Sequence, residues 1–108
     1  GMLVGTRALN SLRNAHISKA FIDIKGVDIE KGFSVDAFEV CDVFTEVMSL
    51  AQETIAMAEY SRFGTVACVR LAQIGDMGRV VTNKEISDTY KKAFFEMGTK
   101  LYTTYDFR

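Results

Sequence analysis

The sequence has little of what metal centres and disulfide scaffolds require. Among its 108 residues there is no proline, one histidine, His16, and two cysteines, Cys41 and Cys68. Two cysteines are too few for a disulfide framework, and a single histidine does not support a Cys/His zinc site. We therefore expect no metal and no cofactor. A surface or capping role is favoured for His16, which stands in a turn before the first expected strand.

The chain also lacks long apolar runs and a strong charge of either sign. Its formal net charge is −1, and its basic residues are scattered, so the sequence does not predict direct DNA binding. No run approaches the ~20 apolar residues of a membrane span, and no signal-peptide pattern is present. These absences predict a cytosolic protein. Without linkers or proline-rich stretches, residues 1–108 are expected to form one domain.

The spacing of the apolar residues predicts an α/β chain. Helices are expected over residues 6–14 and 36–52, and in a segment that opens at 82–85 and ends at Gly98. Strands are expected over residues 19–24, 54–58, 66–71, 80–81 and 99–104. Asp36 with Glu39, and Thr82 with Glu85, have the spacing of capping boxes. This order predicts a layered α/β architecture with a mainly parallel sheet.

Two polar turns follow the first two expected strands. The first, residues 25–35, is expected to be a loop and holds two glycines; the second covers residues 59–64. If the strands are parallel neighbours, both turns lie at one edge of the sheet, where small molecules bind in open α/β folds. Arg62 in the second turn is suited to a phosphate or carboxylate. For the first turn, the alternative is an ordinary strand-to-helix loop. For Arg62, the alternative is a solvent-exposed arginine or one that forms a salt bridge with Glu59.

Four short motifs occur in a defined order along the chain: residues 26–28 (Gly-Val-Asp), 32–34 (Gly-Phe-Ser), 61–64 (Ser-Arg-Phe-Gly) and 80–83 (Val-Val-Thr-Asn). Their order and spacing resemble those of the C-terminal effector domain of DeoR-family transcriptional regulators, over about residues 5–102. The resemblance implies a fold similar to ribose-5-phosphate isomerase and the sugar-phosphate deaminases. It also implies that the ligand is a phosphorylated sugar, or a similar small anion, acting as inducer.

Carried over position by position, the resemblance implies a pocket with two walls. One wall would contain Gly26, Asp28, Gly32 and Ser34, and the other Ser61 and Arg62. Arg62 stands where the family usually has lysine. Further departures from the family pattern are Phe44, Glu59, Tyr60 and Asn83.

The resemblance covers only the second half of the family's sensor and none of its helix-turn-helix. We therefore expect a truncated sheet with an uncovered edge and apolar surface. A second copy of the chain could supply the missing cover, so a homo-oligomer is expected.

Two further function classes stay open at this point. A sugar-phosphate isomerase-like enzyme would use Asp28 or Glu39 as a general base, and an interaction module would bind no ligand. The resemblance favours the non-enzymatic sensor, because the glycine turn lacks the denser acidic cluster that the isomerases have there.

Overall fold

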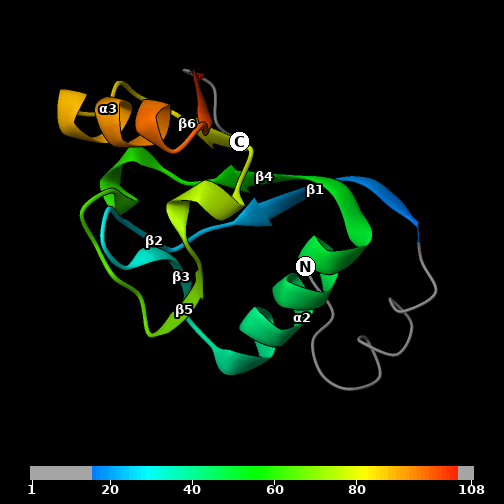
Figure 1. The fold of residues 1–108 in the computed structure, drawn as a ribbon. Coiled ribbons are helices and arrows are strands. Elements are labelled where there is room, and N and C mark those ends of the chain that lie inside the picture. Colours follow the sequence, from blue (N-terminus) through cyan, green and yellow to red (C-terminus); the bar gives the residue numbers. More distant parts are fainter. Residues whose placement is uncertain (1–15, 105–108) are drawn as a thin grey trace.

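The computed structural model describes residues 16–104, which form seven strands, two α-helices and two short 3-10 helices (Figure 1). The strands are β1 (Ile17–Asp23), β2 (Gly26–Asp28), β3 (Gly32–Val35), β4 (Ala51–Met57), β5 (Val69–Ala72), β6 (Arg79–Thr82) and β7 (Lys100–Thr103). The helices are α2 (Phe38–Leu50), η1 (Tyr60–Arg62), η2 (Ile74–Asp76) and α3 (Asp88–Glu96). The helix expected over residues 6–14 lies outside the described residues.

The larger sheet has four strands in the order β1-β4-β6-β7, and every neighbouring pair is parallel. β1 and β4 pair from Ile17 with Ala51 to Asp23 with Met57. This confirms the predicted α/β class with a mainly parallel sheet, and it confirms that the first two expected strands are parallel neighbours. The second of them starts earlier than expected, because α2 ends at Leu50 and the chain enters β4 directly.

The smaller sheet, β2-β3-β5, is antiparallel and was not expected. The expectation of a loop over residues 25–35 is wrong, since β2 and β3 form a hairpin in which Gly26 pairs with Ser34 and Asp28 with Gly32. The strand expected over residues 66–71 is β5, which begins at Val69 and pairs with β3 instead of joining the parallel sheet. Strands this short carry too few residues for alternation to be visible in a sequence.

Both predicted capping boxes are wrong. α2 begins at Phe38, and its N-cap is Ala37, whose side chain makes no capping bond. α3 begins at Asp88 after Ser87, three residues beyond Glu85, again without a side-chain cap. Packing determines both helices, because α2 buries Val43 and Phe44 and α3 buries Phe94.

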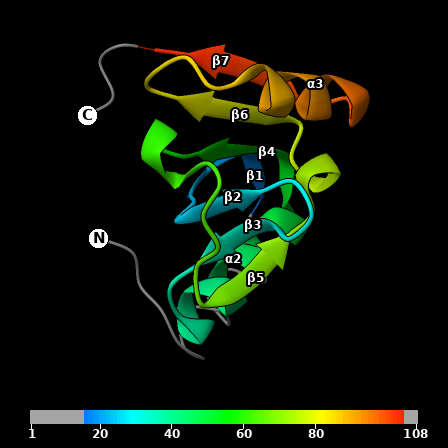
Figure 2. The same ribbon diagram turned by 90° about the vertical axis from the view of Figure 1, so that its left-hand side faces the viewer.

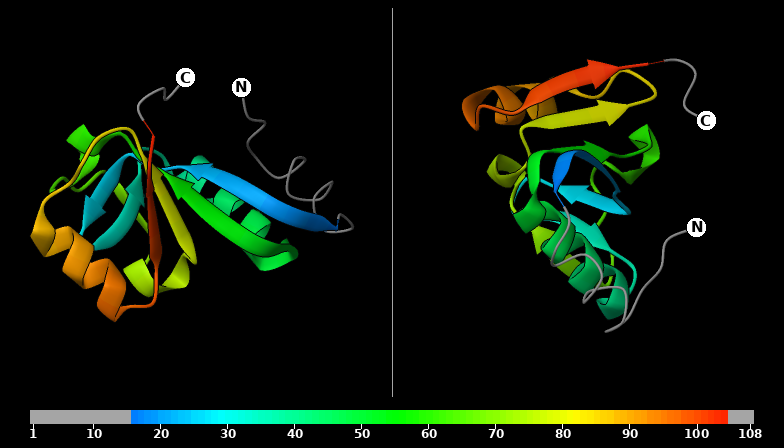
Figure 3. Two further views of the ribbon diagram at one scale, coloured as in Figure 1. Left: turned by 90° about the horizontal axis from the view of Figure 1, so that it is seen from above. Right: turned by 90° about the vertical axis from the view of Figure 1, so that its right-hand side faces the viewer.

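The buried hydrophobic cluster of the described residues packs on one face of the parallel sheet. Ile22, Ala56 and Val80 are at most 1% exposed and belong to one buried cluster with residues of α2, α3 and the smaller sheet. The views agree that α2 lies at the β1–β4 side of the molecule and α3 at the β7 side (Figures 2 and 3). No helix in the described part of the chain is long and apolar enough to cross a bilayer.

Candidate functional site

The two polar turns meet beyond the carboxyl ends of β1 and β4. Val27 forms a parallel bridge with Phe63, and the Gly64 amide donates a hydrogen bond to the Val27 carbonyl at 2.7 Å. The first turn is the β2–β3 hairpin and the second is η1 with the residues around it. They meet because β1 and β4 run parallel and side by side, so both chains leave the sheet at the same edge.

Asp28 closes the tip of the hairpin. Its Oδ2 accepts hydrogen bonds from the backbone amides of Glu30 at 3.1 Å and Lys31 at 2.8 Å. This is the usual way in which an aspartate side chain stabilises a turn. Asp28 is therefore the last residue of β2, and its carboxylate is engaged by the local backbone.

The two glycines of the hairpin are required by close packing. A Cβ on Gly26 would lie 2.4 Å from the Ser34 Oγ and 2.8 Å from the backbone of Thr65 and Ala67. A Cβ on Gly32 would lie 2.2 Å from the Ala72 carbonyl oxygen, and the backbone there has φ +77°. Both positions thus exclude a side chain for reasons internal to the fold.

Ser34 is turned inward. Its side chain is buried, with the residue 1% exposed, and its Oγ accepts the amide of Ala67 at 2.8 Å. That bond ties β3 to the segment between η1 and β5. The hydroxyl is therefore already used in holding the segment that follows the second turn against β3.

Ser61 and Arg62 lie in η1 and are exposed. Within residues 16–104 the Arg62 side chain makes no ion pair, so the salt bridge to Glu59 considered as an alternative is not found. The Thr65 hydroxyl donates to the Arg62 carbonyl at 2.8 Å and fixes the backbone behind it. The guanidinium is left accessible at the edge where the two turns meet.

Three residues that the sequence did not mark as site residues adjoin these turns. The Asn83 Oδ1 accepts the Tyr60 amide at 2.8 Å, and the Lys84 ammonium lies 4.6 Å from the Tyr60 ring centroid. The Tyr90 hydroxyl donates to the Val27 carbonyl at 3.4 Å. Asn83 could have been found, because it directly follows a strand at the same edge of the sheet. The helical spacing of Tyr90 favoured a place in the core or in an interface.

The environment of Tyr90 changes its acidity. Burial, and after it the nearby charge of Asp28, raise the pKa of the Tyr90 phenol above its ordinary value of 10.0, while a hydrogen bond with the Gly64 backbone acts in the other direction. The Tyr90 ring also packs edge-on against Phe63, with 5.4 Å between centroids. Tyr90 therefore joins α3 to both turns through its ring and its hydroxyl.

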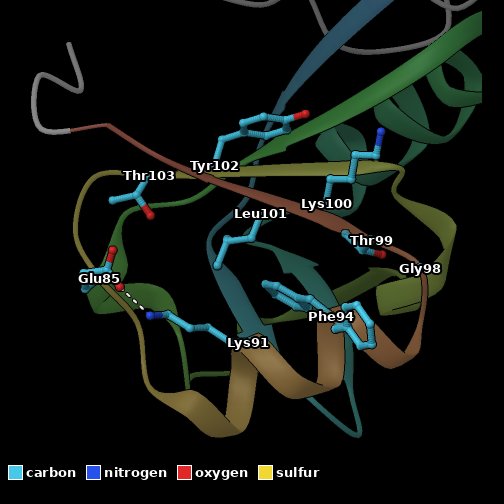
Figure 4. Close-up of a pocket in the computed structure, with 10 residues that line it drawn as sticks. Glu85, Lys91, Phe94, Gly98, Thr99, Lys100, Leu101, Tyr102 and Thr103 are labelled. Atoms are coloured by element: carbon cyan, nitrogen blue, oxygen red, sulfur yellow. Dashed lines mark hydrogen bonds and ion pairs between the residues drawn. The ribbon is translucent and has the colours of Figure 1, made fainter.

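A separate groove of about 710 Å³ lies between α3 and β7 (Figure 4). Phe94 and Leu101 are among its apolar lining residues, and the ion pair between Lys91 and Glu85 lies along it. None of the six predicted site residues lines this groove. Residues 16–104 contain no cluster of three or more side chains able to hold a metal ion.

Comparison with known proteins agrees with the motifs. The model of the DeoR C-terminal sensor domain matches residues 1–84. The chain is 26% identical over 97 residues to an uncharacterized HTH-type transcriptional regulator, YulB, of Bacillus subtilis strain 168, covering 90% of this chain and 38% of that protein. It is 22% identical over 102 residues to the HTH-type transcriptional repressor GlcR of the same strain, covering 94% of this chain and 39% of the repressor. The chain thus spans well under half of each relative, and it belongs to the DeoR C-terminal sensor domain family.

Proposed function

We propose that this sensor domain binds a phosphorylated sugar, or a similar small anion, as the inducer of a transcriptional regulator. The ligand would lie at the edge formed by residues 26–34 and 59–64. The observation that carries the proposal is the direct junction of the two turns, by the Val27–Phe63 bridge and the bond from Gly64 to Val27. It supports one composite site instead of two separate loops.

The chemistry of this edge suits an anion. Arg62 is exposed and is not neutralised by a described carboxylate, and the Lys84 ammonium lies nearby over the Tyr60 ring. A guanidinium binds the oxygens of a phosphate in pairs, and an ammonium adds a second positive charge. The exposed Ser61 hydroxyl is available for a sugar hydroxyl. In this proposal the positive side chains of Arg62 and Lys84 bind the ligand's phosphate, and the remaining polar groups bind its sugar.

The other residues of the expected pocket wall shape it without contacting the ligand. The backbone at Gly26 and Gly32 is closely packed, and the Ser34 hydroxyl is bound to the Ala67 amide. Direct ligand contact is proposed for Ser61 and Arg62, and for the exposed side of the Asp28 turn. DNA binding in such a regulator is assigned to sequence other than this sensor chain.

Thermal unfolding with a panel of compounds tests the proposal. The panel contains pentose phosphates, hexose phosphates, the parent sugars and inorganic phosphate. A ligand that binds only the folded state stabilises it by about 2.7 kcal/mol at a hundred times its Kd. We expect at least one sugar phosphate to raise the Tm and its parent sugar to have no effect.

The variant Arg62→Ala should abolish this rise while leaving the Tm without ligand unchanged. Arg70→Ala is the matched control, because Arg70 is also an exposed arginine and lies on β5, outside both turns. If the Tm stays unchanged with every compound, the result would favour an interaction module that binds no ligand. Isomerisation of a pentose phosphate that Asp28→Asn abolishes would establish the enzyme instead.

We also propose that the domain self-associates. The four-stranded sheet is parallel, and parallel sheets are normally covered on both faces. On the face opposite the core, Phe21 is 60% and Tyr102 45% exposed. We expect a second copy of the chain to cover this surface in an oligomer.

A further inference from the structure

The Tyr90 hydroxyl reaches the junction of the two turns from a third element, the helix α3. It donates to the Val27 carbonyl at 3.4 Å, and it also has a hydrogen bond with the backbone of Gly64. A Cβ on Gly64 would lie 3.8 Å from this hydroxyl. The Tyr90 hydroxyl therefore lies beside the two residues whose backbone hydrogen bond joins the turns.

The ring of Tyr90 is held in place by its packing. It lies edge-on to Phe63 of the second turn, with 5.4 Å between ring centroids, and its centroid is 6.3 Å from that of the buried Phe94. A tyrosine that is fixed at its ring has little freedom left, because only two torsion angles place its hydroxyl. The hydroxyl is thus presented to the junction in a defined position, which favours recognition of a small molecule.

The bond from Tyr90 to Val27 is one that a ligand can replace. Hydrogen bonds between a hydroxyl and an oxygen acceptor usually measure about 2.7–2.8 Å, so a bond of 3.4 Å is long and weak. The Val27 carbonyl also accepts the Gly64 amide at 2.7 Å. If the phenol turns to another acceptor, the carbonyl keeps its stronger bond, and no acceptor is left unpaired. The hydroxyl can therefore be transferred to a ligand at little cost in stability.

Asp28 supplies a hydrogen-bond acceptor near this donor. It directly follows Val27, and burial together with the Asp28 charge raises the pKa of the Tyr90 phenol, so the phenol keeps its proton at neutral pH. Both hydrogen bonds of the Asp28 carboxylate are accepted by Oδ2, and within residues 16–104 its Oδ1 makes none. A neutral hydroxyl donor near a carboxylate oxygen suits a sugar hydroxyl, which accepts from the first and donates to the second.

We propose that Tyr90 determines the specificity of the effector site by binding one hydroxyl of the sugar together with Asp28. This inference rests on the proposed function, in which Arg62 and Lys84 bind the phosphate. The ligand is then a sugar phosphate with a free hydroxyl at the end away from its phosphate. Such a ligand contacts the hairpin, the second turn and α3 at the same time.

The phosphate itself fits the Tyr90 end of the site less well. The Asp28 carboxylate is close enough for its charge to raise the pKa of the Tyr90 phenol, after the larger effect of burial. The same negative charge would repel a phosphate placed there. The distribution of charge therefore orients the ligand, with its phosphate at Arg62 and Lys84 and its sugar at Tyr90.

Titration calorimetry with Tyr90→Phe tests this contact. The probe is the sugar phosphate of the thermal-unfolding panel that gives the largest rise in Tm. We expect Tyr90→Phe to bind it about fivefold more weakly than the wild type, which is the effect of losing one neutral hydrogen bond. The substitution keeps the ring that packs against Phe63. Tyr102→Phe is the matched control, because Tyr102 lies on β7, outside both turns, and should keep the wild-type Kd.

Monodeoxy analogues of the same sugar phosphate separate ligand contact from a structural role. For one analogue, the loss of affinity should be about fivefold smaller in Tyr90→Phe than in the wild type, because one partner of the missing hydroxyl is already absent. A structural role would weaken the parent compound and every analogue by the same factor. That result, or a wild-type Kd for Tyr90→Phe, would overturn this inference alone. If no compound of the panel raises the Tm of the wild type, the inference and the proposed function are both wrong.

Discussion

The Gly64 amide donates a hydrogen bond to the Val27 carbonyl at 2.7 Å, and this bond fastens the turn after β4 to the hairpin after β1. The same carbonyl also accepts the Tyr90 hydroxyl at 3.4 Å. One backbone oxygen thus connects two turns and α3. The proposed ligand site depends on this junction, so substitutions that loosen it should affect stability and binding in separable ways.

Gly26→Ala should destabilise the domain. The added Cβ would lie 2.4 Å from the Ser34 Oγ and 2.8 Å from two backbone atoms, which have no room to move independently. Such overpacking costs about 1–3 kcal/mol. Gly78→Ala is the matched control, since no atom lies within 4 Å of the added Cβ there. Urea denaturation should show a lower midpoint for Gly26→Ala than for Gly78→Ala, and equal midpoints would contradict the close approach.

Ser34→Ala should reduce stability more than Ser61→Ala. The first substitution leaves the Ala67 amide without its acceptor in a partly buried place, at a cost of about 1–3 kcal/mol. Ser61 is exposed in η1, so its replacement should change the free energy of unfolding little. For sugar-phosphate affinity we expect the opposite order, so Ser61→Ala should weaken binding more than Ser34→Ala. If Ser34→Ala unfolds at the wild-type urea concentration, its hydroxyl does not have the structural role described.

Tyr90→Phe should change how stability depends on alkaline pH. The pKa of Tyr90 is raised in the folded state, so the unfolded chain loses this proton first as the pH rises. The neutral phenol's contribution is therefore complete below its ordinary pKa of 10.0 and is lost as the pH increases through the higher folded value. Compared with Tyr90→Phe, the wild type should lose stability more steeply in that range.

The exposed tyrosine of β7 gives the control for this experiment. Tyr102→Phe removes one phenol from a residue that is 45% exposed and lies outside both turns. Unfolding by guanidinium at a series of alkaline pH values measures both variants against the wild type. Identical slopes for wild type and Tyr90→Phe would show that the Tyr90 hydroxyl is not held in the environment described.

The sequence predicted the parallel sheet because its strands and α2 have clear apolar patterns. It also predicted that the two turns meet, since that follows from β1 and β4 being parallel neighbours. The hairpin could not be predicted in the same way, because β2 has three residues and β3 four, and the glycines between them are typical of loops as well.

The sequence indicated which turns carry the candidate site residues, but it did not indicate which contacts each side chain makes. Ser34 was expected in a pocket wall, and only its 1% exposure and its bond to Ala67 reveal the inward orientation. The capping boxes failed because spacing alone does not tell whether Asp36 or Thr82 adjoins the first helical residue. Tyr90 reaches the site from α3 through tertiary packing, which no local pattern contains.

The most direct test of the composite site is to map ligand binding on the isotope-labelled domain by two-dimensional NMR. A sugar phosphate that raises the Tm should shift the amide signals of residues 26–34 and 59–64 together, with a single dissociation constant for both segments. The signals of residues 98–103, along the groove between α3 and β7, should stay unchanged. Shifts confined to that groove, or shifts in one turn without the other, would contradict the account.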